Sequence, residues 1–568
     1  MIRNVLKQEI GKAIKKVFTQ EADFSVEVPA SPAGRPANSE RGDYSSNVAL
    51  ILAGGAFGKP EAFRKPTEVA EKIKSELEKS ETIKKYFSKI EIAPPGFLNF
   101  WISENALIEE LKKLDLKLTF GKGQKIQVEF ISANPTGALH IGHLRSAFYG
   151  DALSNILEAA GYKVEREYFI NDSKESTQIK ELGKTVLGQG TSYLTERLKD
   201  QISNLKNAIQ NLKQKNPENL FGQAGYLMAK EIQKDNQKFI EKGLGIKFDK
   251  WFSEEKELRK KKEFAKTIKA LEKKNLTYRK DGAWWLKTAE FGDDEDRVLL
   301  RSDGAASYFL SDIAYHLNKF KRGFKKIINI WGADHQGHVK RMQSVKKIFD
   351  WPGELKILIS QLVTIKEAGQ VKKLSKRKGD VILAEDLLKE VGLDATRWFF
   401  LEKSLNTHME FDLALAKERS EKNPVFYVQY AGARIHSILT KSQISIRQLA
   451  DKSLPRQQAG QTNSKSQIPA LPASRSNLKQ LNHQSELALI KKLIQFPEVI
   501  EDIAKDYQVH RFTNYVYQLA TIFNIFYRDV KVLGSGENEP ARLALVFLTR
   551  QILEKCLKLL GISAPEKM

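Results

Sequence analysis

Cysteine is almost absent from this sequence: the only one among 568 residues is Cys556. A single cysteine excludes an intramolecular disulfide framework and a zinc site built from several cysteines. Cys556 falls on the apolar stripe of a helix expected near the C-terminus, which favours a core residue over a reactive thiol.

Long apolar runs are missing as well. No stretch approaches the roughly 20 apolar residues that a membrane-spanning helix needs. The N-terminal stretch MIRNVLKQEIGKAIKKVF spreads its apolar residues among lysines and lacks the continuous apolar core of a signal peptide. We therefore expect a cytoplasmic protein with no membrane partner.

Acidic residues are fewer than basic residues. The chain has 93 Lys and Arg against 70 Asp and Glu, a formal net charge of +23, and an isoelectric point near 9.5. Such an excess favours a large anionic partner, with nucleic acid as the first candidate. The alternative is a basic surface that is merely solvated.

A βαβ unit is predicted in the first third of the chain. KIQVEFI, residues 125–131, alternates apolar and polar residues as a strand does, and the loop SANPTGA follows. From Ile141 onward apolar residues recur at helical spacing, and Gly161 is a favourable helix stop before the next strand, YKVEREYFI. Strand, helix and strand in this order imply a parallel sheet.

The whole chain is too long for one core, so we expect three or more domains. Long charged helical sequence interrupts the α/β region before its strands return, and the pattern is helical near the C-terminus apart from a stretch rich in Ser, Gln, Pro and Asn. We predict an α+β N-terminal domain (1–112), a Rossmann-like α/β domain with a parallel sheet (113–404) and a helical insertion (about 175–295), and an all-α C-terminal domain (405–568) with a mobile polar loop (about 450–484).

Two histidines open the helix of the βαβ unit. His140 and His143 are three residues apart, so they share one face of its first turn, where free backbone N–H groups and the positive end of the helix dipole also lie. Gly142 between them would let a bulky ligand approach the backbone. Either histidine alone would be read as a polar residue near a helix cap. The pair favours a phosphate site, because donors fixed in advance stabilise charge that grows on a phosphate.

A second basic motif lies about 230 residues later. KLSKR, residues 373–377, follows the last expected strands of the sheet. Lys373 and Lys376 would supply compact positive charges to a departing pyrophosphate. The alternative is a solvated basic run in a lysine-rich chain.

These two motifs resemble the HIGH and KMSKS boxes of class I aminoacyl-tRNA synthetases. The sequence around the histidines, SANPTGALHIGHLRS, is similar to that of arginyl-tRNA synthetases, in which Ala-Asn-Pro-Thr-Gly leads into the histidines. So are the segments RGDYSSNVAL, PPGFLNF, YFINDS, KNPVFYVQYAGARIHSI and LLGISAPEKM. The resemblance covers nearly the whole chain, and the polar loop departs from it.

The resemblance implies an arginine–tRNA ligase. Such an enzyme forms arginyl-adenylate from arginine and ATP, with Mg²⁺ on the phosphates, and then transfers arginine to the 2′-hydroxyl of the terminal adenosine of tRNA(Arg). Its N-terminal domain contacts the tRNA elbow and its C-terminal domain binds the anticodon. We further expect a monomer and no metal held by the protein.

The same resemblance assigns the residues of each site. They are His140, His143, Lys373 and Lys376 for catalysis; Pro135, Thr136, Gly137, His140, Gly142, His143, Ser375 and Lys376 for ATP; Glu129, Ser132, Asn134, Glu254, Tyr308, Asp312, Asp334 and His335 for arginine; and Tyr427, Tyr430 and Arg434 for tRNA.

An arginine substrate also agrees with the residues themselves. A guanidinium is planar and always charged, so its pocket should offer carboxylates. Tyr308 and Asp312 are four apart on one face of an expected helix, and the resemblance puts Asp312 on the guanidinium. Asp334 and His335, with His338, could instead hold a metal, but their place after a buried strand favours the rim of the ATP and arginine site.

Three alternatives stay open. The chain could make a small-molecule adenylate as another HIGH-type nucleotidyltransferase, although that reaction has no need of a long basic helical domain. It could also bind tRNA without catalysis, although a scaffold needs neither motif. Tyr427, Tyr430 and Arg434, which share a helix face by their spacing, could be core residues rather than an anticodon surface.

Overall fold

The computed structural model describes residues 1–19, 21–29, 41–54, 65–215, 217–367, 370–371, 382–442 and 478–568. Lys373, Ser375 and Lys376 lie outside the described residues, and so does all but the end of the predicted polar loop. No helix of the described part is long and apolar enough to cross a membrane.

The N-terminal domain is a small α+β unit. Helix α1 (Ile2–Phe18) turns Leu6, Ile10 and Ile14 inward, because they recur three or four residues apart. Its antiparallel sheet has the order β1 (Val26–Glu27), β2 (Tyr44–Ser46), β4 (Phe97–Ile102) and β3 (Phe87–Ala93). The other helices are α2 (Val48–Ala53), α3 (Pro66–Leu77), α4 (Glu81–Tyr86) and α5 (Glu104–Lys113).

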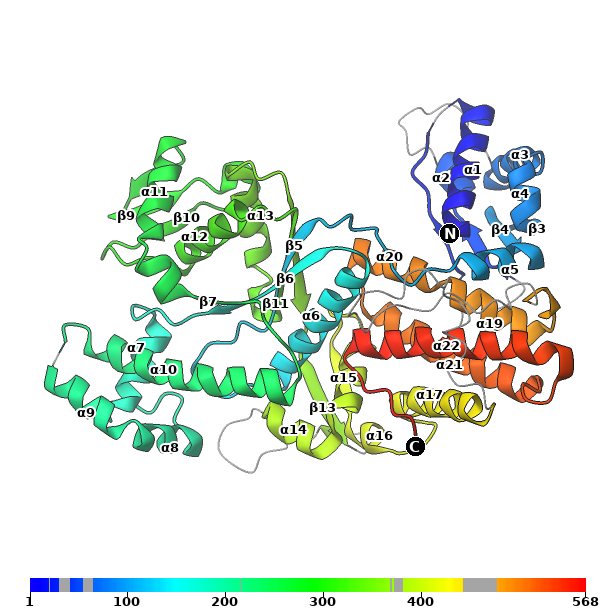
Figure 1. The fold of residues 1–568 in the computed structure, drawn as a ribbon. Helices are drawn as coiled ribbons and strands as arrows, with labels where there is room; N and C mark the ends of the chain where they lie inside the picture. The colour runs from blue at the N-terminus through cyan, green and yellow to red at the C-terminus, as the bar shows by residue number, and fades with distance from the viewer. Residues whose placement is uncertain are drawn as a thin grey trace, which may run out of the picture.

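A parallel sheet forms the middle of the molecule (Figure 1). From edge to edge its strands are β12 (Glu354–Ser360), β11 (Lys326–Gly332), β5 (Lys125–Glu129), β6 (Lys163–Ile170) and β7 (Lys250–Ser253). Helix α6 (Ile141–Ala159) joins β5 to β6, while α12 (Tyr308–Lys321) precedes β11 and α13 (His338–Ile348) follows it. Ile126, Gln127 and Val128 of β5 are all fully buried, so both faces of the sheet are covered. The Rossmann-like fold class is confirmed.

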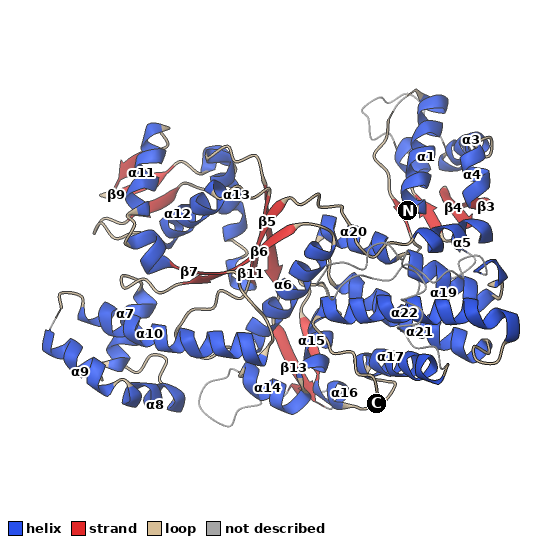
Figure 2. Ribbon diagram, in the orientation of Figure 1, coloured by secondary structure: helices blue, strands red, loops and turns tan. Residues whose placement is uncertain are grey.

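The described part of the stretch predicted as a helical insertion, about 175–295, is free of strands only in its first half. Helices α7 (Thr177–Val186), α8 (Glu196–Asn204), α9 (Lys206–Lys215) and α10 (Leu220–Lys238) lie together beside the sheet (Figure 2). After a π-helical turn (Phe239–Gly243) the chain forms β7 of the parallel sheet. A second π-helical turn (Glu255–Arg259), α11 (Glu263–Lys273) and an antiparallel sheet of β8 (Thr277–Lys280), β9 (Ala283–Leu286) and β10 (Arg297–Leu300) follow.

Short strands explain this difference from the sequence interpretation. β7, β8 and β9 have four residues each, too few to show a period among the surrounding lysines. One signal was present: the Asp281-Gly282 turn between β8 and β9, with φ of +49° and +75°, is a dipeptide typical of tight hairpins.

The C-terminal domain is a helical bundle, but the region expected to be all-helical from residue 405 contains a strand. β15 (Met409–Asp412) pairs in parallel with β13 (Val363–Glu367), which also pairs with β14 (Gln370–Val371). Three described helices precede the bundle: α14 (Ala384–Val391), α15 (Leu393–Leu401) and α16 (Leu413–Lys417). The described helices of the bundle are α17 (Pro424–Lys441), α19 (Gln484–Ile494), α20 (Phe496–Asp506), α21 (His510–Asp529) and α22 (Glu539–Leu560). Cys556 of α22 is fully buried, as its place in the apolar stripe predicts.

Helix α6 is bonded directly to the C-terminal domain. Tyr149 of α6 donates a 2.5 Å hydrogen bond to the carbonyl oxygen of Tyr507. Buried Arg397 of α15 donates to the Asp151 carboxylate of α6 at 2.7 Å and to the carbonyl oxygen of Leu560, at the end of α22, at 3.1 Å. The place of the two histidines therefore depends on how the bundle packs.

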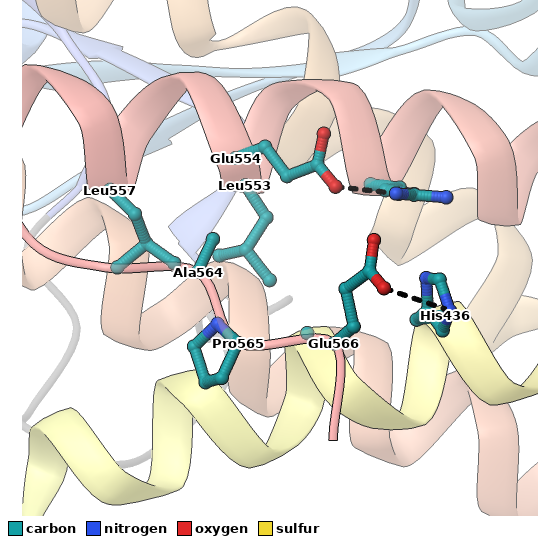
Figure 3. Close-up of a pocket in the computed structure, with 9 residues that line it drawn as sticks. His436, Leu553, Glu554, Leu557, Ala564, Pro565 and Glu566 are labelled. Atoms are coloured by element: carbon teal, nitrogen blue, oxygen red, sulfur yellow. Dashed lines mark hydrogen bonds and ion pairs between the residues drawn. The ribbon is translucent and has the colours of Figure 1, made fainter. Parts of the chain in front are cut away.

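The C-terminal residues lie on the surface of the same bundle. Figure 3 shows Ala564, Pro565 and Glu566 between α17 and α22, with the Glu566 carboxylate turned toward His436 of α17. Glu566 Oε2 lies 3.8 Å from His436 Nε2. Ala564 and Glu566 are exposed and Pro565 is half-buried, so these residues lie on the surface of the bundle.

Candidate active site

The two histidines cap their own helix. The N–H of Gly142 donates to His140 Nδ1 at 3.1 Å, and the N–H of His140 donates to His143 Nδ1 at 3.1 Å. A neutral imidazole that accepts through Nδ1 carries its hydrogen on Nε2. Burial lowers the pKa of His140, and burial together with the charge of His140 lowers the pKa of His143 to about 3. Both rings are therefore neutral at physiological pH, and each has an Nε2–H donor.

Gly142 has a local reason to be glycine. A Cβ at this position would lie 3.0 Å from Cε1 and 3.2 Å from Nδ1 of His140, so a side chain would push the capping ring aside. The structure shows the glycine making room for histidine, whereas the sequence suggested room for a ligand. A role of Gly142 in ATP binding stays a prediction.

The loop from β5 to α6 is strained where it leaves the sheet. Ile131 and Ser132 have φ of +68° and +41°, a left-handed conformation that costs free energy for residues other than glycine and is concentrated at functional sites. The Ser132 hydroxyl donates to Glu129 Oε1 at 3.0 Å and accepts from the Phe169 N–H at 3.1 Å. These bonds stabilise the turn and hold the Glu129 carboxylate at the end of its strand.

The next residues, predicted to bind arginine or ATP, differ in exposure. Asn134 and Gly137 are exposed, Thr136 is half-buried and Pro135 is buried. The carbonyl oxygen of Gly137 accepts from Asn236 of α10 at 3.0 Å. The inserted helices therefore hold this loop from its outer side.

Three predicted carboxylates gather at the carboxyl end of the sheet. Glu129 ends β5, Glu254 follows β7, and Asp312 lies on α12; the two glutamates are buried and Asp312 is half-buried. Burial, and after it the charges of Glu129 and Glu254, raises the pKa of Asp312 to about 7. Burial also raises the pKa of Glu254, against the opposing charge of Arg259, whose Nε lies 3.4 Å from Glu254 Oε1. An acidic pocket of this kind suits a cationic ligand.

The remaining residues predicted for arginine are more open to solvent. Tyr308, the first residue of α12, is 49% exposed. Asp334 and His335 lie in a short turn after β11, with Asp334 Oδ2 3.4 Å from His335 Nε2. No sequence pattern selected Tyr193 of the insertion, but it lies near Tyr308: burial and then the charge of Tyr308 raise its pKa. These residues therefore have the position of a rim around the acidic pocket.

The first described residues after the lysine motif, from Ile382 onward, lie beside the residues that flank His140. The N–H of Ile141 donates to the carbonyl oxygen of Ile382 at 3.0 Å, and the N–H of Ala384 donates to that of Leu139 at 2.9 Å. The segment that follows the lysine motif is thereby joined to the start of α6. The roles predicted for Lys373 and Lys376 stay predictions.

The residues predicted to contact tRNA lie on an aromatic and basic surface of the bundle. The Arg434 guanidinium lies 4.9 Å from the ring centroid of Tyr430 and 5.3 Å from that of Tyr527, and both tyrosines are exposed. Arg434 also donates to Asn524 Oδ1 at 2.8 Å, which fixes it between α17 and α21. Tyr427 is half-buried against the core. Exposed rings beside an arginine suit base stacking and phosphate contact, and both remain predictions.

Three family models match the chain in succession. Residues 4–102 match the arginyl tRNA synthetase N-terminal domain, residues 104–420 the catalytic domain of class I (R) tRNA synthetases, and residues 428–568 the DALR anticodon binding domain. The matches follow the order of domains in the structure.

Curated relatives match over nearly their whole length. The arginine–tRNA ligase of Syntrophotalea carbinolica is 37% identical over 590 residues, which is 99% of each chain. That of Carboxydothermus hydrogenoformans is 38% identical over 558 residues, 94% of this chain and 93% of the relative. Among solved structures, the arginyl-tRNA synthetase of Thermus thermophilus, 21% identical with a TM-score of 0.74 over 100% of both chains, shares the fold.

Proposed function

The chain belongs to the arginyl-tRNA synthetase family, and we propose that the histidine pair and the three carboxylates form its catalytic site. The enzyme joins L-arginine to tRNA(Arg) with the use of ATP. The observation that supports this assignment is that two neutral Nε2–H donors lie at the same end of the sheet as an acidic pocket. A phosphate needs donors and a guanidinium needs carboxylates, and parallel sheets bind ligands at their carboxyl ends.

In the first step, an oxygen of the arginine carboxylate attacks the α-phosphorus of ATP, and the bond to pyrophosphate breaks. His140 and His143 donate from Nε2 to phosphate oxygens as negative charge grows there. Lys373 and Lys376 neutralise the departing pyrophosphate. Since the histidines are fixed by their capping bonds before the reaction, they need little reorganisation in the transition state. Pro135, Thr136, Gly137, Gly142 and Ser375 complete the ATP site.

In the second step, the 2′-hydroxyl of the terminal tRNA adenosine attacks the carbonyl carbon of arginyl-adenylate, and AMP leaves. No covalent protein nucleophile takes part, so the protein acts by positioning the reactants and by stabilising charge.

The arginine pocket has an acidic base and an open rim. Asp312 and Glu254 bind the guanidinium, and Glu129, Ser132 and Asn134 hold the α-amino and carboxylate end. Tyr308, Asp334 and His335 line the rim. Burial of Glu129 and Glu254 and half-burial of Asp312 support this division, because a charge contact is strongest where water is excluded.

Mg²⁺ fits the phosphates of ATP better than a protein cage. Within the described ranges, no group of three or more His, Cys, Asp or Glu side chains could hold a metal ion. Mg²⁺ usually keeps several waters and binds through substrate phosphates, whose charge it neutralises.

We also propose that the enzyme acts as a monomer in the cytoplasm. Gel filtration would test the oligomeric state, and cell fractionation would test the location.

The function is tested by aminoacylation of bulk tRNA with the twenty amino acids in separate reactions. Arginine alone should be esterified, and pyrophosphate should be released only with arginine. Release with a different amino acid, or esterification of none, would contradict the assignment.

Arginine binding should weaken as the pH falls through about 7. The pKa of Asp312 is raised to about 7, so this carboxyl is mostly protonated, and neutral, below that pH. Arginine must then displace a proton, and its affinity should fall by up to about tenfold per unit of pH below the pKa and level off above it. Calorimetry across this range measures the effect.

Asp312→Asn is the control for this titration, because asparagine has no proton to displace. Its weaker arginine binding should be nearly independent of pH in the same range. If the wild-type affinity is already flat between about pH 6 and 8, Asp312 does not titrate on arginine binding.

Arg434→Ala should raise the KM for tRNA(Arg) and leave the KM for ATP unchanged. The substitution removes a cation that lies over two exposed rings and can contact phosphate; one such contact is worth about tenfold or less near the surface. Arg279→Ala is the matched control, since it removes an exposed arginine 5.0 Å from the Trp284 ring in the catalytic domain. Equal effects of Arg434→Ala on both KM values would indicate a folding defect.

A further inference from the structure

A row of buried polar side chains crosses the three middle strands of the parallel sheet. Asn329 of β11, Glu129 of β5 and Glu167 of β6 are neighbours in register on adjacent strands, and all three are buried. Two cations meet this row from the α12 side: Lys319 pairs with Glu129, and Arg322, just after the helix, pairs with Glu167. Because sheet centres normally hold apolar side chains, these charges need a reason.

Lys319 is fully enclosed. Its side chain is 0% exposed, and its ammonium bonds the Glu129 carboxylate and donates to Asn329 Oδ1 at 2.8 Å. Asn329 donates in turn to His316 Nε2 at 2.8 Å, and His316 Nδ1 donates to the backbone carbonyl oxygen of Asp312 at 2.8 Å. One network therefore runs from Glu129 to the backbone of the residue proposed to bind the guanidinium.

Stability alone does not explain the Lys319–Glu129 pair. Taking two charges out of water costs several kcal/mol per ion. Apolar residues of similar size often stabilise a fold as well as a buried ion pair does. Glu129 makes contacts that an apolar residue could not: its Oε1 accepts from Ser132 of the strained loop at 3.0 Å, and its charge acts on Asp312. Glu129 thus faces Lys319 on one side and the arginine pocket on the other.

We propose that Lys319 is a positioning residue of the arginine site: it compensates and orients the Glu129 carboxylate, so that Glu129 accepts the α-ammonium group of the substrate. Lys319 does not touch the substrate. Burying a charge without a partner costs free energy, and a carboxylate whose position is fixed by Lys319 is ready to accept a charge-assisted hydrogen bond from an ammonium group. This inference rests on the proposed role of Glu129, so the experiment separates the two residues.

The experiment compares L-arginine with 5-guanidinopentanoate, which is arginine without its α-amino group. Calorimetry on the full chain with tRNA(Arg) present gives both dissociation constants. The wild type should bind arginine at least about tenfold more tightly, as for one charge-assisted contact. Lys319→Gln keeps a polar contact to Asn329 but loses the charge. It should weaken arginine binding by about tenfold and change the affinity for the analogue by less than about threefold. The dissociation constants of the two ligands should then be similar.

Arg322→Gln is the matched control, because it breaks the neighbouring ion pair of the same row without touching Glu129. It should change both dissociation constants by one common factor. If circular dichroism shows that Lys319→Gln does not fold, Lys319→Met replaces it. Methionine is of similar length and has no charge, so Glu129 again loses its partner and the preference for arginine should again fall.

An unchanged preference for arginine in the Lys319 variant, or an equal loss for both ligands, would overturn the positioning role. Glu129→Gln decides whether the premise itself is at fault. If that variant also keeps the preference, Glu129 does not bind the α-ammonium group, and the proposed assignment falls together with the inference. Loss of preference in Glu129→Gln but not in the Lys319 variant overturns only the role of Lys319.

Discussion

Asp312→Asn should lower the affinity for arginine by about 10²–10³-fold, which is the loss from breaking a buried ion pair reduced by the hydrogen bonds that remain. Asparagine keeps the shape of aspartate and loses its charge. A guanidinium leaves water at low cost only where a carboxylate meets it, and burial together with the charges of Glu129 and Glu254 makes the site of Asp312 favourable to an added cation. Calorimetry with tRNA(Arg) present measures the effect. Canavanine, a guanidinium-like analogue, should lose affinity in parallel, and ATP binding should hardly change.

Asp303→Asn is the matched control. Asp303 is an exposed carboxylate in the turn before α12, where its Oδ1 accepts from the Ala305 N–H at 2.8 Å, and its replacement should leave arginine binding unchanged. If Asp312→Asn binds arginine within about threefold of the wild type, under ~0.7 kcal/mol, Asp312 is not the guanidinium partner. The assignment then moves to Glu254.

His143→Ala should slow adenylate formation by about 10²–10³-fold at saturating ATP and arginine, as the loss of one preorganised donor does. The affinity for ATP should change far less, because the charge that the Nε2–H meets develops only in the transition state. ATP–pyrophosphate exchange measures the rate. Since the pKa of His143 is lowered to about 3, its ring should stay neutral and contribute no titration to the rate at physiological pH.

Alanine at position 143 also removes the acceptor of the His140 N–H, a cap worth about 1 kcal/mol. His483→Ala measures the cost of losing an imidazole cap away from the site: His483 is the N-cap of α19, and its Nδ1 accepts from the Ser485 N–H at 3.3 Å as that of His140 accepts from Gly142 in α6. It should lower the thermal stability to a similar extent and leave pyrophosphate exchange at the wild-type rate. If His143→Ala also exchanges pyrophosphate at that rate, His143 is not a phosphate donor.

Local sequence patterns were enough to predict several features of the protein. The helix that begins after His140 and ends before Gly161 follows from its apolar spacing and from a glycine whose φ is +93°. The histidine pair and its flanking motif indicated the arginyl-tRNA synthetase family, which the comparisons confirm. Motif resemblance also selected Glu129, Glu254 and Asp312, which the structure brings to one end of the sheet, and their roles stay predictions.

Packing between distant segments decided the rest. β7 and β15 have four residues each and are strands only because β6 and β13 pair with them. In the sequence Lys319 is one lysine among many; it meets Glu129, 190 residues away, only when α12 packs on the sheet. The pKa of Asp312 likewise depends on burial and on two carboxylates from other segments. Desolvation and charge act between groups that are neighbours in space and far apart in the chain, so no local pattern contains them.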